Sequence, residues 1–134
     1  MSANRVARFN TQTNTWSTLG TGSSNGVSGI GSVNVSTLAV VGNEVVVGGW
    51  FTSAGGVSAN SVARFNTQTS TWSSLGTSSS NGVSGSVNAL AVVGNEVYVG
   101  GGFTSAGGVR ANYVARLTRR RTLGQGSARS VATA

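Results

Sequence analysis

The sequence predicts an all-β fold built from repeated four-stranded units, and two observations carry this prediction. The text from Ser2 to Val57 returns almost unchanged from Ser58 to Val109, and a third copy begins at Arg110. Hydrophobic residues make up 38% of the chain and fall in short runs between Gly, Asn and Ser. Such runs are typical of strands, whereas disordered chains are usually poor in hydrophobic residues and rich in charge. Only 8% of the residues are charged, so we expect a folded chain.

The repeat is regular enough that its copies are expected to share one structure. The second copy starts 56 residues after the first, and the third starts 52 residues after the second, because the first copy holds four additional residues. Over residues 2–29 and 58–85 the two copies differ at only four positions. Whatever sheet one copy forms, the other is therefore expected to form as well.

The first two strands of a unit are joined by a tight turn. They are predicted at Val35–Val41 and Glu44–Gly49 in one unit, and at Val87–Val93 and Glu96–Gly101 in the next. The Gly-Asn pair between them suits a two-residue hairpin, because both residue types tolerate positive φ. Both strands are nearly continuous apolar runs, as in strands buried on both faces, so we expect them in the interior of the fold.

The third and fourth strands of a unit are joined by a polar turn and alternate apolar with polar residues. Alternation indicates one covered and one solvated face, so we expect the fourth strand to lie outermost. The third strand is predicted at Arg5–Phe9, Ser61–Phe65 and Tyr113–Leu117, and the fourth at Thr15–Leu19 and Thr71–Leu75.

Three features of each unit resemble the kelch-type β-propeller repeat. A double glycine ends the second strand, an aromatic residue ends the third, and a tryptophan opens the fourth after six intervening residues. The family usually has Tyr where this chain has Phe. The resemblance implies four-stranded blades around a central channel, a galactose oxidase-like propeller, with the glycines allowing close approach and the aromatic residues packing between blades. The residues are Gly48-Gly49 and Gly100-Gly101, Phe9 and Phe65, and Trp16 and Trp72.

The wider text of the repeat resembles kelch-like arrays in large bacterial surface proteins. It consists of GGxFTSAGG, then VARFN, then W-S-x-L-G. This resemblance implies an extracellular or cell-surface location. The kelch resemblance also suggests a copper-radical oxidase, but the sequence contains no His and no Cys, which excludes that copper site here.

The chain holds about two blades and part of a third, whereas a closed propeller has roughly four to eight, so we expect an incomplete ring. Propeller blades are expected over residues 2–116, as repeats 2–57 and 58–109 and a partial repeat 110–116. Two explanations stay open. Copies of the chain assemble head to tail, with the N-terminal third and fourth strands of one completing the first two strands of another. Otherwise the chain is a fragment of a longer product that contains the missing blades.

Residues 117–134 are expected to form a basic, disordered tail. Six of the nine arginines lie at or after Arg110, and they dominate the net charge of +7. The repeat text breaks off after Arg116, and the expected tryptophan is replaced by Gly124. Arg-rich text that begins inside a repeat is what a shifted reading frame produces, which favours the fragment. Because the arginines lack interleaved aromatic residues and a groove-reading helix, no nucleic acid is expected as partner.

No residue is assigned a catalytic, cofactor-binding or metal-binding role, and no enzyme activity is expected. His, Cys and Asp are absent, so the usual nucleophile–base pairs and metal sites have no residues to form them. The two acids, Glu44 and Glu96, take equivalent places after the Gly-Asn turn, which favours a structural role. No apolar run is long enough to span a bilayer, so membrane insertion is not expected.

The sequence therefore predicts a non-enzymatic structural or protein-interaction module made of propeller blades. Its expected partners are other copies of the chain or the missing blades of a longer chain, with protein or glycan ligands as a further expectation. The alternative is a glycan-binding surface or adhesion module. It would use two long loops, Gly76–Ser86 and Thr104–Asn112, which are expected on one face and are rich in Ser, Thr, Asn and Gly.

Overall fold

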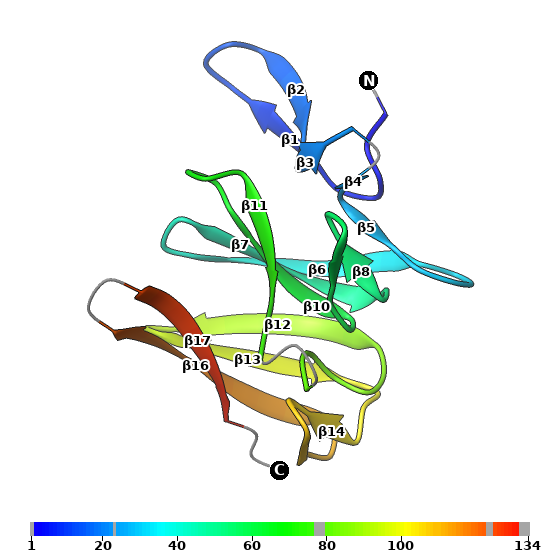
Figure 1. Cartoon of the computed structure of the whole chain (residues 1–134), viewed down its shortest axis with the longest axis vertical. Helices are drawn as coiled ribbons and strands as arrows, with labels where there is room; N and C mark the ends of the chain where they lie inside the picture. Colours follow the sequence, from blue (N-terminus) through cyan, green and yellow to red (C-terminus); the bar gives the residue numbers. More distant parts are fainter. Residues whose placement is uncertain (1, 23, 77–79, 123–124, 132–134) are drawn as a thin grey trace.

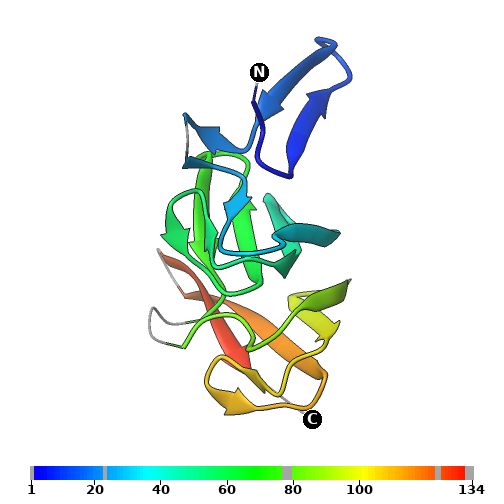
Figure 2. The same cartoon turned by 90° about the vertical axis from the view of Figure 1, so that its right-hand side faces the viewer.

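The chain forms an open row of three antiparallel units. The computed structural model describes residues 2–22, 24–76, 80–122 and 125–131. Figures 1 and 2 show a two-stranded hairpin at one end of the row and two four-stranded sheets after it, with the termini at opposite ends. The described strands do not close into a ring. Strands supply the regular structure of this part of the chain, and it contains no helix of the length and apolarity that crossing a bilayer requires.

The N-terminal hairpin consists of β1 (Ala7–Asn10) and β2 (Thr15–Thr18). Its turn is held by the Asn10 side chain, whose Oδ1 accepts hydrogen bonds from the backbone N–H groups of Gln12 and Thr13 at 2.9 and 3.1 Å. The same two bonds recur at the corresponding turn of the next unit. Asn side chains favour such turns because they satisfy backbone donors locally.

The first complete sheet contains β6 (Asn34–Val41), β7 (Glu44–Trp50), β10 (Val62–Asn66) and β11 (Thr71–Ser74). Its spatial order is β11-β10-β7-β6, so the second and third strands of the unit are central. The fourth strand lies at the outer edge, which confirms the prediction made from its alternating pattern.

The second complete sheet contains β12 (Val87–Val93), β13 (Glu96–Gly101), β16 (Val114–Thr122) and β17 (Gln125–Val131). Its order is β12-β13-β16-β17, the same arrangement of first to fourth strand. The register between second and third strands is also the same in both sheets. The near-identical repeats thus form equivalent sheets, as expected.

The fourth strand of the second sheet comes from the segment 117–134, for which a disordered tail was expected. In the structure β16 continues to Thr122, and β17 pairs along it from Arg116 opposite Val131 to Thr122 opposite Gln125. This pairing supplies partners for backbone groups that the edge of β16 would otherwise leave open. Gly124, which replaces the expected tryptophan, lies outside the described residues.

Short strand pairs join the long loops on one side of the row. The loop before β6 is drawn to the loop after β7 by the β5–β8 pair, and a bridge between Val83 and Ala106 repeats this contact in the next unit. The two kinds of long loop therefore share one face, as predicted. The short strands are β3 (Gly20–Thr21), β4 (Ser24–Asn25), β5 (Val27–Ser28), β8 (Ser53–Ala54), β9 (Val57–Ser58), β14 (Ser105–Ala106) and β15 (Val109–Arg110).

The first strand of each unit is less buried than its apolar sequence predicted. Strand β7 is buried along most of its length, but the side chains of β6 alternate between exposed and half-buried. Leu38 and Val40 on β6 are 54% and 68% exposed, and Val93 on β12 is 62% exposed. Both strands are sheet edges and lie side by side. The prediction of an interior position is therefore wrong for their outer side chains, because no described residue covers them.

The buried side chains form two clusters, one at each junction between units. The first seam joins the hairpin β1–β2 to the first sheet and contains Leu19, Phe65 and Trp72. The second seam joins the two sheets and contains Leu75 and Val87. The hydrophobic core of this chain is thus a series of interfaces between repeats, as in repeat proteins generally.

Candidate functional site

Trp72 is the central residue of the first seam. Its side chain is only 7% exposed and packs on Phe65, with ring centroids 5.2 Å apart and planes inclined by 54°. Its indole Nε1–H donates a 2.8 Å hydrogen bond to the backbone carbonyl of Leu19, at the end of the preceding unit. A buried indole needs such an acceptor, so one side chain supplies both apolar contact and a polar link between repeats.

A glycine in the loop after β7 makes room for this tryptophan. Gly55 has a φ of +55°, and a Cβ placed on it would overlap the Trp72 indole. Glycine is therefore required at this position both by backbone conformation and by space. The text FTSAGG is thus a structural part of the seam.

The double glycine at the end of the second strand has a separate role. A Cβ on Gly48 would lie 2.6 Å from Cγ1 of Val87, which belongs to the first strand of the next sheet. Gly48 thus allows the close approach of the neighbouring unit, whereas a Cβ on Gly49 would meet the backbone of Asn34 in its own sheet. At the equivalent Gly100, the nearest described atom is the Tyr113 carbonyl oxygen at 3.9 Å, so no described residue of a further unit packs on that face of the second sheet.

A pair of asparagines ties the long loops together in each repeat. The Asn60 backbone N–H donates to Oδ1 of Asn81 at 2.9 Å, and the Asn60 amide donates to the Asn81 carbonyl at 3.3 Å. Asn4 and Asn25 make the same two bonds at 2.9 and 3.0 Å. Because both receiving asparagines are buried, these bonds fix the loop positions on which any binding at this face would depend.

Both glutamates lie in ion pairs across the second and third strands. Glu44 Oε2 is 3.4 Å from Nη1 of Arg64, and Glu96 Oε2 is 3.1 Å from Nε of Arg116. The two pairs occupy equivalent positions in separate sheets, and the structure does not bring the carboxylates together. No group of three His, Cys, Asp or Glu residues gathers within the described ranges.

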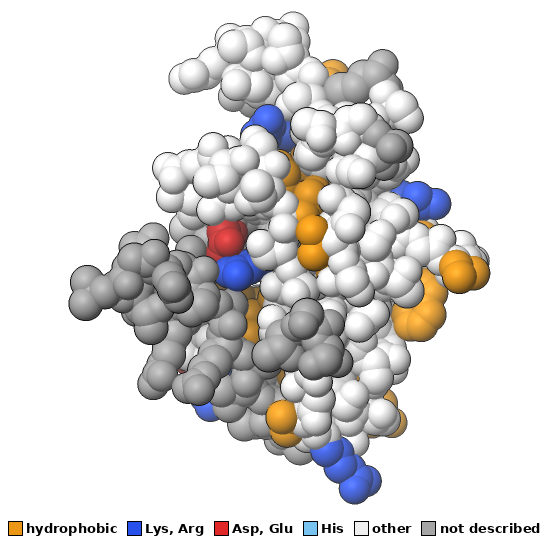
Figure 3. Space-filling model, viewed as in Figure 1, with side chains coloured by type: hydrophobic (Ala, Val, Ile, Leu, Met, Phe, Trp, Pro, Cys, Tyr) orange, Lys and Arg blue, Asp and Glu red, His pale blue; other side chains and the backbone are white. Residues whose placement is uncertain are grey.

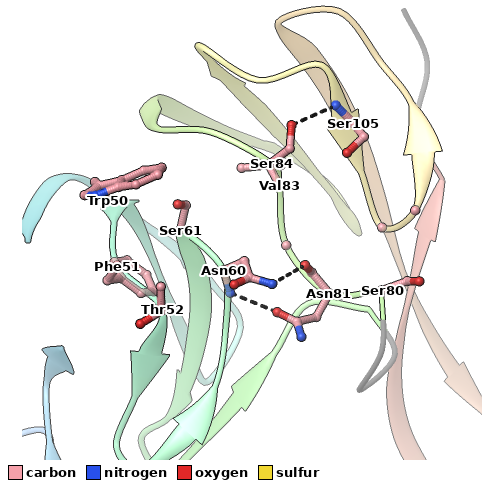
Figure 4. A pocket seen from close by; sticks show the side chains of 13 residues that line it. Trp50, Phe51, Thr52, Asn60, Ser61, Ser80, Asn81, Val83, Ser84 and Ser105 are labelled. Carbon is pink, nitrogen blue, oxygen red and sulfur yellow. Dashed lines mark hydrogen bonds between the residues drawn. The ribbon is translucent and has the colours of Figure 1, made fainter. Parts of the chain in front are cut away.

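A cavity of about 310 Å³ opens on the loop face between the two sheets. Figure 4 shows Trp50 and Phe51 on one side, the Asn60–Asn81 pair below, and Ser84 near Ser105 on the other side. Its polar lining consists of hydroxyl and amide groups rather than charged ones: Thr52, Asn60, Ser61, Ser80, Asn81, Ser84 and Ser105. Figure 3 shows that charged side chains are also sparse on the face it displays.

Sequence reasoning found the loops of this cavity but missed Trp50. Its counterpart in the next repeat is Gly102. The sequence feature that could have revealed Trp50 is therefore a difference between the two repeats, and not a shared residue. The side chain is 40% exposed. The Glu–Arg pairs were missed as well, although glutamate and arginine recur at the same separation in both units.

The strand order, the repeated register and the seams define a β-propeller-type repeat. A family model described as a β-propeller domain of unknown function (DUF5122) matches residues 43–68 and 95–119. The first match spans β7, β10 and the loop between them, and the second runs from β13 through the equivalent loop into β16. No curated protein and no solved structure matches the chain.

Proposed function

We propose that the chain is a non-enzymatic module of kelch-like propeller blades that joins further blades in a larger propeller, as a structural or protein-interaction unit. The double glycine, the aromatic residue and the tryptophan that motivate the kelch assignment all lie in contacts within or between units. The absence of His, Cys and Asp from the sequence, and the pairing of both glutamates with arginines, support a non-enzymatic role.

The observation that carries the proposal is the apolar surface left open at the first unit of the row. Phe9 and Trp16 are 41% and 62% exposed, whereas their counterparts Phe65 and Trp72 are 1% and 7% exposed. The two pairs are otherwise alike, so the difference is the cover that a neighbouring unit supplies. Large contiguous apolar patches on soluble proteins mark interaction sites.

This function is tested with a dye that fluoresces on apolar protein surfaces. We expect the dilute full chain to bind the dye. Replacing Trp16, Leu38, Val40 and Val93 by threonine should remove most of this signal, while circular dichroism keeps its β-sheet spectrum. A dilute chain that binds no dye would contradict the proposal, because its apolar surfaces would then not be accessible to further blades.

A glycan-binding module is the second candidate, and the cavity at the loop face favours it. The exposed Trp50 offers a flat apolar surface, and the Asn and Ser groups beside it offer neutral donors and acceptors. Sites for uncharged ligands combine apolar lining with a few well-placed polar groups. The hydrogen-bonded asparagine pair holds part of this lining in place.

The glycan candidate is tested on an immobilised glycan array. If it is right, some glycans bind the full chain, and Trp50→Ala removes that binding while Trp16→Ala, which lies outside the cavity, retains it. Absence of binding to every glycan, or binding that Trp50→Ala leaves unchanged, would remove this candidate.

A further inference from the structure

We propose that the unit joining the open end is a second copy of this chain, which inserts Trp16 of its β1–β2 hairpin into the second seam of the first copy. This inference rests on the proposed function and names its partner. Figure 1 shows the hairpin and the second sheet at opposite ends of the row, so the contact would be head to tail.

The β1–β2 hairpin has the same geometry as the β10–β11 hairpin, whose Trp72 is buried in the first seam. The rings of Phe9 and Trp16 lie 5.0 Å apart at 52°, and those of Phe65 and Trp72 lie 5.2 Å apart at 54°. The strand registers are also equivalent. The hairpin can therefore enter a seam without rearranging its own side chains, which lowers the cost of association.

The second seam repeats the surroundings of Trp72 without a tryptophan among its described residues. In the first seam the indole is surrounded by residues that include Leu19, Gly55 and Phe65. Their counterparts Leu75, Gly107 and Leu117 line an apolar cavity in the second seam. Its volume is about 20 Å³, which does not admit an indole while β16 and β17 stay in place.

The charges of the hairpin fit the same position. Arg8 is equivalent to the two arginines that pair with glutamates on a neighbouring second strand. Among the described residues Arg8 has no ion pair, and its Nε–H donates to Ser17 Oγ at 3.1 Å. With β1 alongside β13 in the repeated register, Arg8 would take the place of Arg116 and lie next to Glu96.

Strand β6 of the second copy, which follows the hairpin, would pack on the second sheet of the first copy. In the first copy, the open face at Gly100 corresponds to the face at Gly48 on which Val87 packs. The residue of the second copy that matches Val87 is Val35, on β6. One register thus places Trp16 of the second copy in the second seam, Val35 at the Gly100 face, and Arg8 next to Glu96 in the position that Arg116 holds in the single chain.

Association requires an exchange of strands, because β13 has one edge on β12 and the other on β16. The incoming β1–β2 hairpin replaces β16 and β17. The exchange uncovers Leu117, which is buried in the single chain, and buries Phe9 and Trp16 in its place; it is favoured because the aromatic pair buries the larger apolar area. Each copy then contributes two blades, so a ring of roughly four to eight blades contains roughly two to four copies.

The test is the mass of the full chain in solution, measured by sedimentation over a wide range of concentration. We expect a discrete closed species of roughly two to four copies. Trp16→Ala should weaken association by about tenfold or more, since buried tryptophans dominate interface energies. Ile30→Ala is the control, because this apolar side chain is 91% exposed and lies outside the hairpin and both seams, and it should leave association unchanged.

A charge reversal gives a second readout. Arg8→Glu should weaken association severalfold, and adding Glu96→Arg should restore part of it.

The mass measurement and the dye test together separate the two proposals. A chain that stays single at every concentration but binds the apolar dye would contradict association with a second copy and leave the proposed function standing. A single chain without dye binding would contradict both. Association that Trp16→Ala leaves unchanged, in a variant with an intact β-sheet spectrum, would exclude the hairpin as the joint.

Discussion

Trp72 links two repeats because its surroundings satisfy every part of its side chain. The ring packs on Phe65, the indole N–H reaches the Leu19 carbonyl, and Gly55 leaves room for the ring edge. Trp16 has the same sequence context but is 62% exposed. The environment, and not the residue type, therefore decides whether this tryptophan is a core residue or a surface residue.

Alanine substitution at two glycines separates backbone strain from lack of space. Gly55 and Gly94 have φ values of +55° and +57°, but a Cβ on Gly94 meets nothing within 4 Å. Gly94→Ala should lower the free energy of unfolding by about 1 to 2 kcal/mol, the cost of the left-handed conformation for a non-glycine residue. Gly55→Ala should cost a further ~1 to 3 kcal/mol, because the new methyl group overlaps the indole. Urea unfolding measures both, and equal losses would contradict the seam geometry.

The two tryptophans of the repeat should differ in what their removal costs. Trp72→Ala is expected to lower the free energy of unfolding by about 3 to 5 kcal/mol, because it removes a buried ring and its hydrogen bond. Trp16→Ala should change it by less than about 0.5 kcal/mol in dilute protein, as for other exposed positions. The measurement is chemical unfolding at a concentration where the chain is single. Similar losses at both positions would show that the hairpin is covered.

At the scale of elements, the sequence determined most strand positions because short apolar runs and Gly-Asn turns mark them directly. Strands β12 and β13 have the predicted bounds to the residue, Val87–Val93 and Glu96–Gly101. Strand β17 was not predictable, because its Arg-rich text lacks the repeat pattern and its position depends on pairing with β16. The exposure of β6 was missed for a related reason, since the apolar pattern shows what can be buried but not whether a neighbour is present.

Hydrogen exchange distinguishes the central strands from the edge strands. The backbone of β7 and of β13 is paired on both sides, whereas β6 and β12 have one partner strand each within their sheets. We expect the slowest exchange in β7 and β13, and fast exchange at those amides of β6 and β12 that point away from the sheet. Peptide-resolved exchange of dilute protein provides the measurement. Equal protection of β6 and β7 would contradict the position of β6 at an open edge of its sheet.

At the scale of the whole molecule, counting strands predicted an incomplete ring, and the described strands do not close into one. The number of blades follows from the repeat, so the missing closure was visible in the sequence. The loop-face cavity was predicted only as a pair of polar loops. Its shape depends on the asparagine pair and on Trp50, which come together from segments far apart in the chain.

The emission of Trp16 at increasing protein concentration tests the central claim most directly. Replacing Trp50 and Trp72 by phenylalanine leaves Trp16 as the single fluorescent tryptophan, and circular dichroism checks that the sheets remain. We predict long-wavelength, easily quenched emission in dilute protein, which shifts to shorter wavelength and becomes protected as copies associate and bury the ring. Emission of the buried type at the lowest concentration would contradict the open hairpin, and emission that stays exposed at every concentration would contradict its insertion into a second copy.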